Sequence, residues 1–109
     1  MTADFPRTRL DPDTQHEQAV DPEELTRFMD AVVAELAAEL PAAERIAAIG
    51  RLGSALRVAG HLDDALEVHR GAVARSDPSR DPAAAYTARI RLAHTHQWRR
   101  EFDVSNAMF

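Results

Sequence analysis

The spacing of apolar residues between positions 21 and 40 constrains the fold of this chain more than any other feature. They recur at steps of three and four, at Leu25, Phe28, Met29, Val32, Val33, Leu36 and Leu40. This spacing places a broad apolar stripe along an α-helix, and another element must cover that stripe. Asp21-Pro22 precedes it, and Asp suits a helix cap while Pro suits the first helical position. The pattern therefore predicts a helix that begins at Pro22 and ends before Pro41.

Further helices are predicted after Pro41. One runs from residue 42 to about 59 and ends before Gly60, a residue that readily adopts the left-handed conformation found after helices. A third covers residues 62 to about 75, with acidic residues in its first turn and arginines toward its end. Asp81-Pro82 repeats the start signal and predicts a fourth helix to about Trp98. A fifth is expected to begin near Glu101, so we expect an all-α fold with about five helices in antiparallel pairs.

The composition agrees with packed helices and argues against a sheet. Of the 109 residues, 45% are hydrophobic, largely Ala with Leu and Val, while only 4 are Gly and 6% are aromatic. Ala favours helices, and sheets prefer β-branched and aromatic residues. Because each Ala buries little apolar area, the core of such a fold gains modest energy per residue, and burial against a partner would add to it.

The N-terminal residues differ from the rest in charge and pattern. Residues 1–24 hold seven carboxylates and two arginines, which accounts for the whole net charge of −5. Residues 1–20 also carry Pro6 and Pro12 and show neither a helical nor a strand period. We therefore expect a flexible acidic arm over residues 1–20 and a single helical domain over residues 21–109.

Several classes of function find little support in the sequence. The absence of Cys excludes thiolate metal sites and Cys nucleophiles. No apolar run approaches the roughly 20 residues of a membrane span, and the first residues do not resemble a signal peptide, so we expect a cytoplasmic protein without a membrane partner. No phosphate-binding loop occurs, and His94 and His96 are spaced wrongly for metal ligands on one helix face. The isoelectric point near 5.4 argues against a nucleic-acid partner. Because the sequence shows no catalytic or ligand-binding constellation, we expect no enzymatic activity, cofactor or metal.

Residues 46–78 contain small residues at regular positions, namely Leu52-Gly53, Gly60, Ala65 and Ala72, followed by Pro78. This pattern resembles a tetratricopeptide repeat, a family of paired antiparallel helices. In this first copy Pro78 comes one residue later than in the family pattern. A second copy begins at Leu92-Ala93, which corresponds to Leu52-Gly53, although Arg100 replaces the glycine of the turn. The resemblance covers about one and a half repeats over residues 42–109. It implies a short superhelix of stacked helix pairs.

In that family, the first helices of the repeats line a surface that usually binds a peptide. The corresponding positions here are Arg51, Ser54, Arg57, Arg91, His94, Gln97 and Trp98. Arginine pairs bidentately with carboxylates and tryptophan anchors contacts, so the resemblance implies an acidic protein or peptide partner. The alternative is an ordinary solvated helix face.

The C-terminal residues suggest self-association. Phe102, Met108 and Phe109 would remain partly exposed because the last predicted helix has no partner helix in the sequence. Either the chain is a fragment of a longer array, or this end pairs with a second copy as a homodimer.

Three functions are consistent with these features. The first is a non-enzymatic interaction scaffold. Its acidic arm is able to lie on the arginine-bearing surface of the same chain or to reach that of a neighbouring molecule, and the alternative is that the arm serves only solubility. The second is a regulatory or ligand-sensing domain that binds a small anionic ligand or peptide signal. The third is a purely structural oligomerisation piece.

Overall fold

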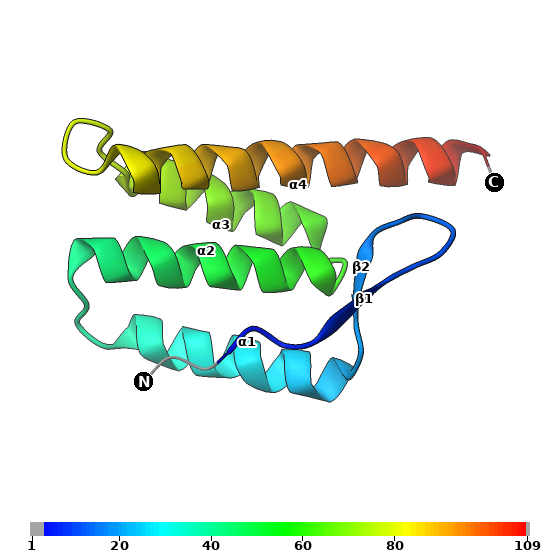
Figure 1. Ribbon diagram of the computed structural model, residues 1–109, viewed down its shortest axis with the longest axis horizontal. Helices are drawn as coiled ribbons and strands as arrows, with labels where there is room; N and C mark the ends of the chain where they lie inside the picture. The colour runs from blue at the N-terminus through cyan, green and yellow to red at the C-terminus, as the bar shows by residue number, and fades with distance from the viewer. Residues whose placement is uncertain (1–3, 109) are drawn as a thin grey trace.

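The computed structural model describes residues 4–108, and within them the chain forms a β-hairpin followed by four α-helices (Figure 1). For Phe102 and residues 104–108 only the backbone is described. The strands are β1, Thr8–Leu10, and β2, Glu17–Ala19. The helices are α1, Pro22–Ala37, α2, Ala42–Val58, α3, Leu62–Arg75, and α4, Pro82–Met108.

Helix α2 is the centre of the packing. It contacts α1, α3 and α4, and α3 also packs against α4. Consecutive helices run in opposite directions, so the start of α2, the end of α3 and the start of α4 meet at one end of the molecule (Figure 1). The hairpin lies at the other end. The prediction of a mainly helical fold is thus confirmed.

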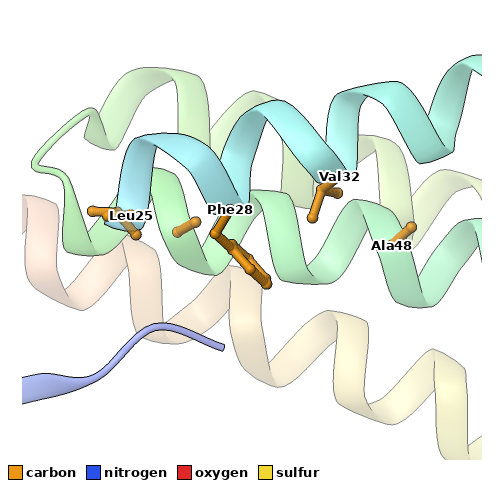
Figure 2. Packing of buried hydrophobic residues seen from close by; sticks show 5 residues of the cluster. Leu25, Phe28, Val32 and Ala48 are labelled. Carbon is orange, nitrogen blue, oxygen red and sulfur yellow. The ribbon is translucent and has the colours of Figure 1, made fainter. Parts of the chain in front are cut away.

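Helix α1 begins where the sequence predicts. The Asp21 carboxylate accepts a hydrogen bond from the Glu23 backbone N–H at 3.0 Å, and Pro22 occupies the first turn. Leu25, Phe28 and Val32 then project toward α2, which carries Ala48 at the contact (Figure 2). Val33 remains 54% exposed, so the buried stripe is narrower than the apolar spacing suggests.

Gly53 of α2 accommodates the ring of His69 from α3. A Cβ atom built on Gly53 would lie 2.5 Å from Cε1 of His69, which is closer than packed side chains allow. Ala65 is completely buried beside this contact, and Gly60 takes a φ of 86° in the turn between the helices. Small residues at positions 53 and 65 therefore permit the helix approach.

The expected fifth helix is wrong, because α4 continues without a break from Pro82 to Met108. The segment from Trp98 to Glu101 contains neither Gly nor Pro, and its Arg and Glu residues favour helix. Arg99 also pairs with Asp63 of α3 and, within α4, with Asp103 at 3.6 Å. Since no turn forms at Arg100, the described residues contain one antiparallel α2–α3 pair followed by a single long helix, and not two stacked repeats.

The expectation of an arm without secondary structure also differs from the structure. Strands β1 and β2 pair antiparallel, with Arg9 opposite Gln18. Asp11 organises the connection, because its carboxylate accepts the backbone N–H groups of Asp13 at 2.8 Å and Thr14 at 3.0 Å. These hydrogen bonds, first that of Thr14, lower the pKa of Asp11. Strands of three residues are too short to show an alternation of apolar and polar residues in the sequence. A hairpin of this size is stable only when it packs against other elements.

The Gly53 contact yields a test in which two similar substitutions have opposite effects. Gly53→Ala should lower the free energy of unfolding by about 1–3 kcal/mol, because the new methyl group collides with the buried His69 ring. Gly71→Ala, in the interior of α3 with no atom near its Cβ position, should raise it by about 0.5–1 kcal/mol through helix propensity. Chemical denaturation of both variants measures the difference. Equal stabilisation by the two substitutions would show that the helices do not meet at Gly53.

Candidate functional site

Trp98 is the centre of the first candidate site, on the C-terminal half of α4. Its side chain is only 6% exposed. The imidazole of His16, from the hairpin, stacks on the indole at 4.1 Å between centroids and an interplanar angle of 14°. Arg57 of α2 places its guanidinium carbon 4.4 Å from the ring centroid, a cation–π distance. The indole is therefore enclosed by an arginine from one element and a histidine from another.

The remaining polar groups of α4 complete this site. The indole Nε1–H donates to Nε2 of His94 at 3.1 Å, and the two rings meet edge to face. Desolvation, followed by the charge of Arg57, lowers the pKa of His94. Gln97 donates to Glu101 at 3.2 Å. We call the set formed by Arg57, His94, Gln97 and Trp98 the Trp98 surface.

The hairpin contributes the opposite charge to the Trp98 surface. Glu17 lies 3.4 Å from Nη2 of Arg57, whose side chain is only 11% exposed. His16 Nε2 bonds to the carboxylate of Glu101 on α4, and this hydrogen bond is the main cause of the lowered pKa of Glu101. The arm is also attached at its other end. Phe5 packs edge-on against Phe28 of α1 at 5.1 Å, and the backbone N–H of Arg7 donates to Glu24 at 3.0 Å.

The structure divides the predicted binding strip into separate parts. Four of its residues form the Trp98 surface. Arg51 instead pairs with Glu35 of α1 at 3.0 Å, and half-buried Ser54 makes no side-chain hydrogen bond within the described residues. Arg91 of α4 lies against Gly50, in the middle of α2. The resemblance to a repeat implies one surface for these arginines, whereas in the structure Arg57 contacts Trp98, Arg51 pairs with Glu35 and Arg91 lies against Gly50.

Sequence reasoning did not assign His16, Glu17 or Glu101 to the site. For the hairpin residues, the sequence offered one indication. The arm is acidic and the predicted binding strip is rich in arginine, which suggested that the arm lies on that strip. The pairing of Glu17 with Arg57 agrees with that hypothesis. The predicted self-association residues Phe102, Met108 and Phe109 have side chains outside the described part of the chain.

A second candidate site lies between the start of α2, the end of α3 and the first half of α4. It is a half-open cavity of about 320 Å³ whose polar lining is His69, Asp81, Thr87 and Arg91. His69 is 1% exposed, and its pKa is lowered to about 4 by burial and then by the positive charges of Arg91 and Arg57. His69 is therefore a neutral imidazole at pH 7.

Comparison with known proteins adds no assignment to either site. The chain matches no protein-family model, no curated protein and no solved structure. Among the described residues, no helix has the length and hydropathy to cross a membrane, and no cluster of three or more His, Asp or Glu side chains is placed to hold a metal ion. Any function must therefore be argued from the two sites themselves.

Burial of His69 predicts a pH dependence of stability. Because its pKa is about 4 in the folded chain and ordinarily 6.5, the unfolded chain binds more protons between these values. The free energy of unfolding is therefore highest above pH 6.5. It falls by on the order of 3 kcal/mol as the pH is lowered toward 4, because the unfolded chain then gains a proton that buried His69 does not accept. Denaturation at both pH values should show that His69→Leu removes most of this dependence. Replacing the exposed His96 by Gln is the control, and an equal effect of the two variants would contradict the burial argument.

Proposed function

We propose that this chain is a non-enzymatic protein-interaction module that binds an acidic segment of a partner protein on the Trp98 surface, and that its own hairpin occupies this surface until the partner displaces it. The observation that carries the proposal is the contact of His16 and Glu17 with Trp98 and Arg57. An acidic segment of this chain is thus already held there.

The geometry of Arg57 leaves room for a better ligand. Its distance of 3.4 Å to Glu17 exceeds the 2.7–2.9 Å typical of a charge-assisted hydrogen bond. Its Nη1 is buried and has no hydrogen-bond partner among the described residues. A carboxylate that binds both terminal nitrogens would satisfy a group that the hairpin leaves unsatisfied, and an unpaired buried donor is costly.

Trp98 supplies the second part of the proposed recognition. Tryptophan and arginine are the residue types that most often dominate binding energy at protein interfaces. Here the indole is covered by the ring of His16, so displacement of the hairpin exposes a flat aromatic face beside a guanidinium. A partner segment with a carboxylate next to a planar or apolar side chain fits these two groups.

The hairpin can act as a regulator because it is joined to the surface that it covers. A tethered segment is present at a high effective concentration and competes with any ligand in solution. Its own stability is low, since a two-stranded hairpin does not persist alone. The balance between these two effects sets the threshold at which a partner gains access.

We also propose that the α2–α3 pair is tetratricopeptide-like. Support comes from the contact of Gly53 with the His69 ring, the positive φ of Gly60 and the buried Ala65. In this interpretation α4 follows the pair as a single helix, and Trp98 lies in the C-terminal half of α4. Self-association through Phe102, Met108 and Phe109 stays a separate prediction.

Displacement of the hairpin can be measured with a peptide made from the chain itself. We expect a labelled peptide of residues 4–20 to bind His16→Ala/Glu17→Ala protein at least about tenfold more tightly than the wild type, because the weakened hairpin no longer competes. Fluorescence anisotropy gives the affinity. Emission of Trp98, the only tryptophan, reports its change of surroundings.

The control arginine for this test is Arg75, which is exposed at the end of α3. Arg57→Gln in the double-variant background should abolish binding and its salt dependence, and Arg75→Gln should leave both nearly unchanged. Equal peptide affinity in wild-type and double-variant protein would show that the hairpin does not control access. Binding that survives Arg57→Gln would remove the acidic-segment proposal.

A further inference from the structure

The cavity at the other end of the helices has the size and walls of a small-molecule site. Its volume of about 320 Å³ falls at the lower end of the range for ligand pockets. Ile46 and a group of alanines from α2, α3 and α4 form the apolar part of its walls. Its walls come from the first half of α2, the second half of α3 and the first half of α4, and they include no residue of the hairpin or of the Trp98 surface.

Arg91 brings an uncompensated positive charge to this cavity. Its guanidinium lies over Gly50, where any Cβ atom would collide with it, so the glycine makes the space for it. Arg91 has no ion pair among the described residues. Desolvation and the neighbouring charge of Arg51 lower its pKa, which means that the environment disfavours the cation. A bound anion would reverse that cost.

His69 is a second polar group on the cavity wall that lacks a partner. It is almost completely buried, and neither of its ring nitrogens has a hydrogen-bond partner among the described residues. A neutral imidazole has one donor and one acceptor, and leaving both unmet in the interior is unfavourable. Thr87 lies one helical turn before Arg91 on the same face of α4 and also lines the cavity. Three groups able to donate hydrogen bonds therefore converge on one apolar cavity.

We propose that this cavity binds a small monocarboxylate with an apolar body. The ligand's carboxylate pairs with Arg91 and accepts hydrogen bonds from His69 and Thr87, and its hydrocarbon part packs against Ile46 and the alanine walls. Asp81 lines the same cavity and carries a negative charge, so a second carboxylate on the ligand is disfavoured. The volume suits a compound of roughly ten non-hydrogen atoms. This site involves neither Arg57 nor Trp98 and is independent of the function proposed for the Trp98 surface.

The probe for this proposal is sodium hexanoate, titrated into the full-length protein at pH 7 and followed by NMR. We expect saturable shifts of the alanine methyl signals of the cavity and of the His69 imidazole, with a dissociation constant on the order of 1 mM. Hexylamine tests the sign of the charge and adipate tests the effect of a second carboxylate. Both should bind at least about tenfold more weakly than hexanoate.

Two matched pairs of variants locate the site. Arg91→Gln should weaken hexanoate binding about tenfold or more, while Arg89→Gln, which alters an exposed arginine of the same helix, should not. Ala84→Leu should fill the cavity and abolish the shifts, while Ala74→Leu on the exposed side of α3 should preserve them. Backbone spectra confirm that each variant is folded. If Arg91→Gln does not fold, Ala84→Leu and the comparison with hexylamine carry the test.

Three results would overturn the proposal. The first is a cavity that holds only water, which would give no saturable shifts at about ten times the expected dissociation constant. The second is hexylamine binding as tightly as hexanoate. The third is unchanged hexanoate affinity in folded Arg91→Gln or Ala84→Leu protein. None of these results bears on the peptide experiment, because the hairpin and Arg57 are unchanged throughout.

Discussion

The packing of this protein depends on two glycines that stand three residues apart on α2. Gly53 admits the ring of His69 from α3, and Gly50 admits the guanidinium of Arg91 from α4. A side chain at position 53 would collide with the buried His69 ring, and one at position 50 would displace the Arg91 guanidinium from its place against α2. The same contacts bring His69 and Arg91 to one cavity, so the feature that allows the helices to pack also forms the second candidate site.

Two arginines of α2 are paired with carboxylates from neighbouring elements. Arg51 is balanced by Glu35 of α1, and Arg57 is balanced by Glu17 of the hairpin. Arg45 has no ion pair within the described residues, but it donates to the backbone carbonyls of Leu36 and Ala38, whereas Arg91 has neither an ion pair nor a side-chain hydrogen bond there. Partly buried arginines favour a nearby carboxylate, and each unsatisfied one is a point where an external carboxylate can bind. Nη1 of Arg51 also lacks a partner among the described residues, but only Arg57 lies beside an aromatic ring and only Arg91 lines the cavity, and these are the two positions at which we place ligands.

Sequence reasoning succeeded where the signal was local. Asp21-Pro22 predicted the start of α1, and the turn at Gly60 separated α2 from α3 close to the observed boundaries. It failed at Arg100, because the resemblance to a repeat suggested a turn where the local residues favour helix. It also failed at residues 8–19, where three-residue strands are too short for a periodic pattern. Candidate site residues were chosen by their repeat positions. The structure places Arg57 against Trp98, whereas Arg51 pairs with Glu35.

The sequence by itself determined that the chain is mainly helical and where three of its helices lie. It also determined that a turn at Gly60 lies between α2 and α3, and that the negative charge is concentrated in the first 24 residues. These properties depend on neighbours along the chain, through helix periodicity, capping and conformational freedom. Only the tertiary structure decided that His16 covers Trp98, that Arg57 meets Glu17, and that His69 and Arg91 line one cavity. Such contacts join residues far apart in the chain, and their positions depend on how whole helices pack, which no local pattern encodes.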